Sequence, residues 1–291
     1  MIGDMQKWTP NVAGIIEHAR EIHPKTEVIS RLVSGEIHRT NYEEVCIRSR
    51  KLGSALEKDG VKKGDVVATL ALNTYRHLEM YYGISGMGAI THTLNFRLHP
   101  EQAIYIINHA EDKIIFVELP FVPILEGLQD QLTTVEKYIV LCEDSEMPET
   151  SLKNAISYEE YIKDGDENYD WPELDDDAAC ALCYTSGTTG NPKGVLYSHK
   201  SNVIHAQAAL TAMTIKPDDS ILMVVPLFHV LAWGIPYFGP MNGLKLVMPG
   251  MQMEGEPLYE LIDKEDITLA FGVPTIWMGL LAYCRDNNKI L

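Results

Sequence analysis

Short, continuous apolar stretches alternate along this chain with longer stretches in which apolar residues recur at helical spacing. Turn-forming residues bound the short stretches, as is typical of buried strands. They predict strands at residues 28–33, 36–39, 66–72, 89–94, 113–117, 138–142, 179–184, 195–197, 220–225, 245–248 and 268–271. The longer stretches predict helices at residues 73–87, 228–241, 257–264 and 274–285. They also predict a helix that ends towards Pro24, one that starts at a capping box of Thr40 and Glu43, one that starts at Pro100, and one that ends near residue 132.

Strands that alternate with helices in this way are typical of βαβ units. The chain is therefore predicted to be α/β, with layered, mainly parallel sheets and helices on both faces. The alternation stops at residues 143–177, where acidic residues, Pro, Ser, Gly and Asn predominate. We interpret this segment as a solvated connector, although its carboxylate clusters leave cation binding as an alternative. It separates two predicted α/β subdomains, at residues 1–172 and 173–291.

The charge balance argues against two classes of partner. The chain has 41 Asp and Glu residues but only 24 Lys and Arg residues, which gives a net charge of −17. Nucleic acids and anionic membranes would be repelled by such a chain. Any anionic substrate must therefore be held by a local site that overcomes the overall field.

Other sequence features bear on the compartment. No uncharged apolar stretch reaches the roughly 18 residues of a membrane span, and the first ten residues lack a basic and apolar leader pattern. We therefore expect neither an integral membrane protein nor a secreted one. Five cysteines, an odd number, fit the reducing cytoplasm. Cys180 and Cys183 form a C-x-x-C pair inside a predicted strand, without a second pair at zinc spacing, and we interpret them as core residues.

The most distinctive chemistry lies between the predicted strands at 179–184 and 195–197. Residues 184–195 read Tyr-Thr-Ser-Gly-Thr-Thr-Gly-Asn-Pro-Lys-Gly-Val. Glycines allow backbone N–H groups to converge on an anion, the hydroxyl groups add donors, and Lys193 adds a point charge. The combination indicates a polyphosphate site. A polar surface hairpin built from ordinary turn residues is the alternative.

The segment is not a Walker A loop, because Lys193 lies three residues beyond Gly190 and is followed by Gly194. It resembles the phosphate-binding signature of the adenylate-forming, or AMP-binding, superfamily of acyl-CoA synthetases, luciferases and peptide-synthetase adenylation domains. The resemblance implies the fold of that superfamily's large N-terminal domain, together with ATP and Mg²⁺. It places the ATP phosphates at Thr185, Ser186, Gly187, Thr188, Thr189, Gly190 and Lys193, and the magnesium ion near Thr185.

A second motif covers residues 226–234, Pro-Leu-Phe-His-Val-Leu-Ala-Trp-Gly. By pattern alone, a histidine on such an apolar helix is more often a core residue than a functional one. The stretch nevertheless resembles the superfamily's aromatic–His segment, which lines the carboxylate pocket. Its Phe-His-Val-x-Ala-Trp form is characteristic of fatty-acyl-CoA synthetases. The resemblance implies that His229 is catalytic, as are Thr185 and Lys193, and that His229, Val230 and Trp233 contact the acyl group.

Two further stretches match the same family. The Phe-Gly-Val-Pro-Thr sequence at 271–275 is similar to a segment that borders the acyl pocket, which implies contacts from Gly272, Val273 and Thr275. An ordinary strand-to-helix junction is the alternative there. Residues 91–102 also match, and we interpret them as scaffold. Many family members have Pro where this chain has Phe96.

The resemblance implies AMP-forming activation of a carboxylic acid, a medium- or long-chain fatty acid, to an acyl-adenylate and then to acyl-CoA. Coenzyme A would be the co-substrate, and a homodimer is one arrangement that it allows. A non-catalytic nucleotide-binding remnant and an adenylation domain that loads a carrier protein are the alternatives. The family's adenine and ribose motifs, its magnesium-binding acid and its small C-terminal domain would follow Leu291. We therefore expect the 291-residue chain to be inactive alone.

Overall fold

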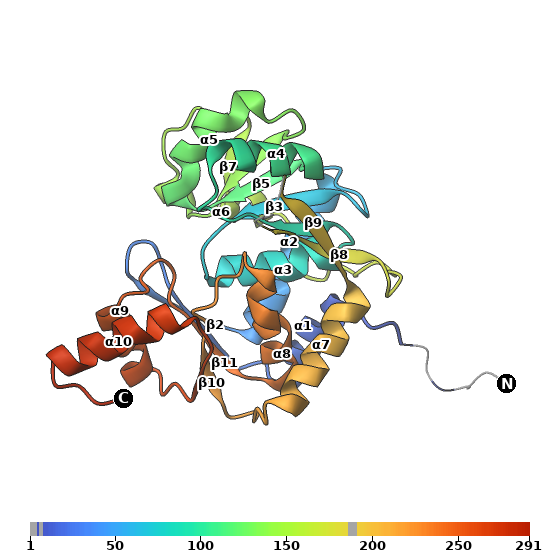
Figure 1. The fold of residues 1–291 in the computed structure, drawn as a ribbon. Coiled ribbons are helices and arrows are strands. Elements are labelled where there is room, and N and C mark those ends of the chain that lie inside the picture. The colour runs from blue at the N-terminus through green and yellow to red at the C-terminus, as the bar shows by residue number, and fades with distance from the viewer. Residues whose placement is uncertain (1–4, 6–7, 186–190) are drawn as a thin grey trace.

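Two β-sheets, with helices between and around them, form the fold in the computed structural model (Figure 1). The structure describes residue 5, residues 8–185 and residues 191–291. Within each sheet most neighbouring strands are parallel. The predicted α/β class with mainly parallel sheets is confirmed. None of the helices in the described ranges combines the length and apolar character needed to cross a membrane.

The larger sheet has seven strands in the order β7-β6-β5-β3-β4-β8-β9. They are β3 (Val66–Leu70), β4 (Ile90–Thr93), β5 (Ile114–Val117), β6 (Lys137–Val140), β7 (Ala155–Ser157), β8 (Ala179–Thr185) and β9 (Lys193–Ser198). Only the β8–β9 pair is antiparallel. Because β4 and β5 lie on opposite sides of β3, the strand order reverses there. Ligand crevices of α/β proteins occur at the carboxyl ends of strands at such a reversal.

The second sheet has five strands in the order β12-β10-β11-β1-β2. They are β1 (Glu27–Arg31), β2 (Ile37–Asn41), β10 (Ser220–Leu222), β11 (Lys245–Met248) and β12 (Leu269–Ala270). The predicted division at residue 172 stays a prediction, and strand pairing crosses it. The early strand β1 pairs with the late strand β11, while β8 joins β4 in the other sheet.

Helix α3 (Tyr75–Gly86) lies between the two sheets, and every one of its residues is buried. Tyr81 and Tyr82 pack into one hydrophobic cluster with residues of β1 and β11, whereas Met80 and Ile84 pack into another beneath the seven-stranded sheet. Helices α2 (Tyr42–Lys58) and α6 (Tyr158–Ile162) share that second cluster. On the opposite face of the same sheet lie α4 (Pro100–Ala110) and α5 (Val122–Leu128) (Figure 1).

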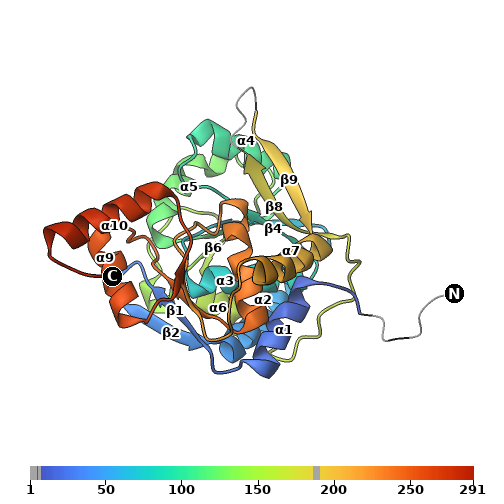
Figure 2. The ribbon, with the colours of Figure 1, turned by 60° about the horizontal axis from the view of Figure 1, so that its bottom comes forward.

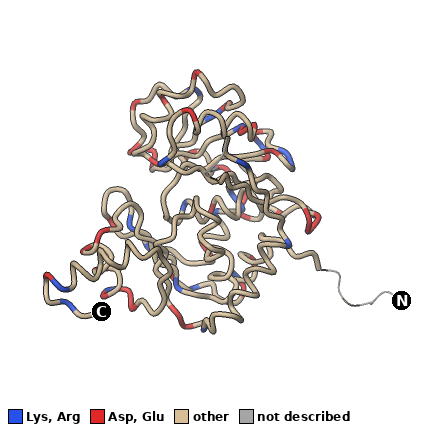
Figure 3. The backbone as a smooth tube through the Cα atoms, in the orientation of Figure 1, with Lys and Arg blue, Asp and Glu red and all other residues tan. Residues whose placement is uncertain are grey.

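The remaining helices surround the five-stranded sheet. Helices α1 (Val12–Ile22), α7 (His199–Ala212) and α8 (Ile235–Asn242) pack against one another. Helices α9 (Gly255–Lys264) and α10 (Pro274–Asp286) pack together on its other face, and Figure 2 shows them on the side of the molecule away from β8 and β9. Acidic and basic residues are interspersed over both parts of the molecule (Figure 3).

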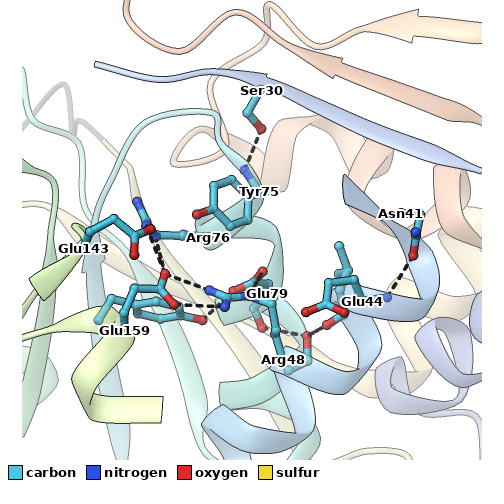
Figure 4. A network of polar contacts seen from close by, with 12 residues as sticks. Ser30, Asn41, Glu44, Arg48, Tyr75, Arg76, Glu79, Glu143 and Glu159 are labelled. Carbon is cyan, nitrogen blue, oxygen red and sulfur yellow. Dashed lines mark hydrogen bonds and ion pairs between the residues drawn. The ribbon is translucent and has the colours of Figure 1, made fainter. Parts of the chain in front are cut away.

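An ionic network around the buried side chains of Glu79 and Arg76 joins α2, α3 and α6 (Figure 4). Arg48 donates to Glu79 at 2.7 Å and to both carboxylate oxygens of Glu159 at 2.9 Å. Arg76 donates to Glu159 at 2.9 Å and to Glu143 at 2.6 Å. Burial alone would raise the pKa of Glu159, but the bonds from both arginines outweigh it and lower that pKa. The network therefore favours the ionised form of Glu159, whereas burial raises the pKa of Glu79 in spite of its bond from Arg48.

The acidic connector contains more structure than its composition indicates. Residues 155–157 form strand β7, which pairs with β6, and α6 follows directly. Tyr158 is fully buried, and its hydroxyl donates to Glu79 at 2.8 Å. The prediction of a purely solvated connector is therefore wrong for this part. Its apolar positions are too few to form a pattern, and they are buried only because the seven-stranded sheet is already in place.

Two local predictions also need correction. The cap of α2 is Asn41 rather than Thr40, because the Asn41 side chain accepts the N–H of Glu44 at 3.0 Å. The predicted helix at 228–241 is wrong in its first part, since α8 begins only at Ile235. The residues before it form a different turn, described below.

Candidate active site

The phosphate-loop sequence connects strands β8 and β9, which form an antiparallel hairpin. Thr185 is paired with Lys193, and Tyr184 is paired with Gly194. Ser186, Gly187, Thr188, Thr189 and Gly190, which the sequence places in the phosphate site, lie outside the described residues. The described ends of the loop are thus brought together by antiparallel pairing of the two strands.

Tyr184 anchors the end of β8 that leads into the loop. Its hydroxyl shares a 2.6 Å hydrogen bond with Nδ1 of His109 on α4. A Cβ atom at Gly194 would lie 3.2 Å from the Tyr184 ring, so glycine allows the close approach of β9 to that ring. Burial, followed by the charge of Asp112, raises the pKa of Tyr184 to about 12. The phenol therefore remains protonated and available as a hydrogen-bond donor at neutral pH.

The hairpin and the Phe228–His229 segment line one cavity, hereafter the active-site cavity, with a volume of about 280 Å³. Thr185 contributes from the end of β8, and His229 and Val230 contribute from the segment after β10. The other lining residues are Thr93, Asn95, Leu98, Ile106, Cys183, Tyr184, Pro192, Val195, Tyr197 and Phe228. The structure thus brings together two motifs separated by 30 residues in the sequence.

The segment that carries His229 has an unusual backbone. The four residues from Val230 to Trp233 have φ angles of 47°, 51°, 47° and 56°. They form the short turn η4 (Val230–Gly234), in which left-handed conformations replace the predicted helix. Such conformations cost L-residues roughly 1–2 kcal/mol each. Surrounding contacts must offset this cost, which is a common situation at functional sites.

The strand end that leads into this turn is held by the β3–α3 region, which the sequence did not assign to the site. The buried Asn73 side chain donates to the carbonyls of Met223 and Val225, at 2.7 and 2.8 Å, and accepts the N–H of Leu227 at 2.8 Å. The hydroxyl of Tyr81 donates to the Leu227 carbonyl. Both the nitrogen and the oxygen of the Asn73 side-chain amide therefore form hydrogen bonds with the strand end that leads to His229. The available signal was its position directly after a buried strand.

A second anchor comes from the seven-stranded sheet. The hydroxyl of Thr93, at the end of β4, donates to the Phe228 carbonyl at 3.3 Å and contacts Sγ of Cys183 at 3.4 Å. Thr93 belongs to the stretch interpreted as scaffold. Its position shows that this scaffold reaches the active-site cavity.

The other predicted site residues among those described do not line this cavity. Lys193 is exposed at the hairpin mouth, and no carboxylate of the described residues forms a salt bridge with it. Trp233 is 41% exposed and is not among the cavity's lining residues. Gly272, Val273 and Thr275 lie at the β12–α10 junction and do not line this cavity either. A Cβ atom at Gly272 would lie 2.7 Å from Val224, so this junction packs against the end of β10.

The described residues fit an ATP polyphosphate. Lys193 is paired with Thr185 across the two strands, the Thr185 hydroxyl donates to the Lys193 carbonyl at 3.5 Å, and neither side chain is buried. A magnesium ion bound to the phosphates would find one protein oxygen here, from Thr185, since hydroxyl and phosphate oxygens suit this hard cation. Asp175, Asp176 and Asp177 also lie close together, but Lys200 forms salt bridges with Asp176 at 2.9 Å and Asp177 at 3.1 Å. The Asp176 and Asp177 carboxylates are therefore already paired with the ammonium group of Lys200.

A family model described as AMP-binding enzyme matches residues 16–289. The chain belongs to this family. The match covers both sheets and both motifs of the active-site cavity, so the resemblance deduced from the phosphate loop is confirmed.

Relatives in this AMP-binding family are named as CoA ligases. The chain is 44% identical to a 3-methylmercaptopropionyl-CoA ligase of Ruegeria pomeroyi, over 100% of this chain and 54% of the relative. It is 45% identical to a medium-chain-fatty-acid–CoA ligase of Ectopseudomonas oleovorans, over 99% of this chain and 53% of the relative. It is 42% identical to a long-chain-fatty-acid–CoA ligase of Thermus thermophilus, over 97% and 51%. The chain thus spans about half the length of these curated relatives.

Solved structures show the same fold. A long-chain-fatty-acid–CoA ligase from Archaeoglobus fulgidus has a TM-score of 0.85 at 23% identity, over 99% of this chain and 57% of that one. An anthranilate CoA ligase in complex with anthranoyl-AMP also gives 0.85 at 23% identity, over 97% and 53%. The expected fold of the AMP-binding family's N-terminal region is confirmed.

Proposed function

We propose that the full-length protein carrying this chain is an acyl-CoA synthetase. It activates a carboxylic acid with ATP to form an acyl-adenylate and pyrophosphate, and then transfers the acyl group to coenzyme A. The observation that carries this proposal is the active-site cavity, where Thr185 of the phosphate hairpin lies with His229 and Val230 of the acyl motif. The names of the three relatives support the same reaction.

In this proposal the chain acts mainly by positioning and by electrostatics. Lys193 and the Thr185 hydroxyl would hold the β- and γ-phosphates, and Thr185 would supply an oxygen to a magnesium ion bound to them. Phe228, His229 and Val230 hold the carboxylate end of the acid. Such fixed donors stabilise developing charge without reorganisation in the transition state. Gly272, Val273, Thr275 and Trp233 remain proposed acyl contacts.

The decisive experiment is carboxylate-dependent exchange of labelled pyrophosphate into ATP by the full-length protein. We expect exchange with aliphatic acids, and mass spectrometry should then show acyl-CoA as the final product. Absence of exchange with any aliphatic or aromatic acid would overturn the proposal. An acylated carrier protein in place of acyl-CoA would assign the protein to the carrier-loading class.

The proposed substrate is a medium- or long-chain fatty acid. Two of the relatives are named for such acids, whereas a third is named for a short thioether acid. The profile of kcat/KM across acids from propionate to palmitate tests this choice. A maximum at 3-methylmercaptopropionate or at an aromatic acid would contradict it.

Three further proposals concern the state of the protein. The five cysteines are buried thiols, which supports a cytoplasmic location. A homodimer is testable by light scattering. Residues 1–291 alone are proposed not to complete the reaction, because the relatives are about twice as long. Acyl-CoA formation by the 291-residue polypeptide at a rate near that of the full-length protein would contradict this last proposal.

A further inference from the structure

The end of the β8–β9 hairpin extends beyond the strand pairing of the seven-stranded sheet. The pairs that β8 forms with β4 end at Leu182, whereas residues 183–185 pair with β9 alone among the described strands. Strand β9 is itself at the edge of the sheet. An isolated pair of strands is marginally stable in water. Side-chain contacts therefore take a large share in placing this end, which carries Thr185 and Lys193.

Tyr184 makes such contacts on the side that faces α4 (Figure 2). Its ring packs against the hydrophobic cluster that α4 and α5 form with the sheet. Its hydroxyl shares the 2.6 Å hydrogen bond with Nδ1 of His109, near the end of α4. The His109 ring in turn stacks on Tyr105, one turn earlier in α4, with 5.3 Å between ring centroids. The helix thus holds the imidazole, and the imidazole holds the tyrosine hydroxyl.

A buried histidine–carboxylate pair lies against the same tyrosine ring. His92 on β4 shares hydrogen bonds of 2.8 and 3.1 Å with the Asp112 carboxylate, and both side chains are 0% exposed. The centroid of the His92 ring lies 5.1 Å from that of Tyr184. Nε2 of His92 is buried without a hydrogen-bond partner among the described residues. Such an atom costs stability, and costs of this kind are common at functional sites.

Tyr184 connects these supports to the active site. It lines the active-site cavity, directly precedes Thr185, and pairs with Gly194, the neighbour of Lys193. His109 does not line the cavity, so its effect on the reaction is transmitted by Tyr184. A displacement of about 1 Å in a positioned group can lower a rate about 100-fold. The contacts of Tyr184 with α4 are therefore placed to influence the phosphate side of the site.

We propose that His109 is a positioning residue, which acts through Tyr184 to place Thr185 and Lys193 for the ATP phosphates. This inference rests on the proposed acyl-CoA synthetase function and adds a residue of α4 to the part of the protein that binds ATP. A hydrogen bond of this kind contributes about twofold to tenfold to an equilibrium constant. The effect should appear for ATP and not for the acid, because other contacts, from Asn73 and Thr93, hold the Phe228–His229 segment.

His109→Leu tests the proposal, because it removes the partner of the Tyr184 hydroxyl and keeps an apolar surface against Tyr105. His99→Leu is the matched control, since His99 is exposed at the start of the same helix and its side chain does not cap it. In pyrophosphate exchange by the full-length protein, His109→Leu should raise KM for ATP about fivefold and change KM for the acid less than twofold. His99→Leu should change neither. An unchanged KM for ATP, or an equal rise in both KM values, would overturn the proposal.

Two further variants distinguish positioning from a general loss of structure. His109→Asn places an amide oxygen where Nδ1 lies, so it can accept from the Tyr184 hydroxyl and should return KM for ATP to within about twofold of the wild type. Tyr184→Phe should raise KM for ATP as His109→Leu does. The double variant Tyr184→Phe/His109→Leu should add no further rise, because the two side chains act as one unit. Independent, multiplying effects would contradict the proposed path.

A binding measurement separates this inference from the proposed reaction. ATP with Mg²⁺ is titrated into the full-length protein by isothermal calorimetry, in the absence of any carboxylic acid. His109→Leu should weaken ATP binding about fivefold, whereas His109→Asn and His99→Leu should not. Equal affinity in the wild type and His109→Leu would overturn the positioning role. Weaker ATP binding by His109→Leu, together with no pyrophosphate exchange by the wild type with any acid, would support the positioning role and overturn the proposed reaction instead.

Discussion

Two of the regions in which polar side chains gather differ in how their groups are satisfied. In the network around Arg48 and Glu79, the charged groups are partnered within the chain, and Glu79 is 0% exposed. Around the active-site cavity, Lys193 and His229 are exposed, and Lys193 forms no salt bridge with a described residue. The charges of the first region are paired with one another, whereas those of the second are available to a ligand.

The comparison shows how burial decides what a polar cluster does. A buried ion that loses its partner is strongly destabilising, so the network joins α2, α3 and α6 firmly. Exposed groups cost little to leave unpaired and remain available for a substrate. Asn73 connects the two regions, since it precedes the buried helix α3 and holds the strand end that leads to His229. Variants should therefore change stability in one region and activity in the other.

The largest effect on stability is expected from Arg48→Met. This change leaves the Glu79 carboxylate buried with only the Tyr158 hydroxyl as a hydrogen-bond partner. The free energy of unfolding should fall by about 3–5 kcal/mol, measured by urea denaturation at pH 7. The double variant Arg48→Met/Glu79→Met removes both charges and is the control, with most of the loss expected to be recovered. A loss below about 1 kcal/mol in the single variant would show that the network is not a structural device.

The next effect concerns Glu118, a buried carboxyl without an arginine hydrogen bond. It is 4% exposed and accepts the N–H of Leu72 at 3.2 Å. Burial raises its pKa from 4.5 to about 7, so the folded state binds a proton between these pH values. The contribution of proton binding at Glu118 to the free energy of unfolding is therefore fully present below pH 4.5, and it is lost as the pH rises through 7.

Glu118→Gln should consequently stabilise the protein by about 3 kcal/mol at pH 8, because glutamine avoids the buried charge. The difference should shrink as the pH falls from 7 and disappear near pH 4.5. Urea unfolding of both proteins at pH 8, 7, 6 and 5 measures the trend. A difference that is constant with pH would mean that the carboxyl is not titrating in this window.

Asn73→Ala tests the connection between the two regions. It leaves the Leu227 N–H and two carbonyls buried without their partner, which should cost about 1–3 kcal/mol of unfolding free energy. It should also misplace His229 and lower kcat/KM in the full-length protein, by up to about 100-fold. Loss of stability with unchanged kcat/KM would show that other contacts suffice to hold the His229 segment.

The smallest effect on stability is expected from Lys193→Ala. Removal of an exposed side chain that forms no salt bridge with a described residue should change the unfolding free energy by less than about 0.5 kcal/mol. A charge-assisted contact to phosphate contributes about 1.5–3 kcal/mol, so kcat/KM for ATP should fall at least tenfold in the full-length protein. Lys200→Ala is the matched control, because Lys200 pairs with Asp176 and Asp177 beyond the hairpin. Equal kcat/KM values in wild type and Lys193→Ala would show that the loop is only a turn.

The sequence by itself determined the α/β class, most of the elements and the family. Strands such as β11 at Lys245–Met248 are continuous apolar stretches with turn residues on both sides, so their pattern is local. The phosphate loop is also local, because its glycines, hydroxyls and Lys193 lie within twelve consecutive positions. Local patterns of this kind can be recognised before any fold is known.

Only the tertiary structure decided how these pieces meet. The pairing of β1 with β11 joins segments more than two hundred positions apart, and no local pattern records it. The left-handed turn at Val230–Trp233 contradicts its own helical pattern, because hydrogen bonds from Asn73, Tyr81 and Thr93 fix the backbone that leads into it. The role of Asn73 depends on which strand ends lie side by side. Such non-local contacts are set by the whole packed chain, and they overrule the preferences of short segments.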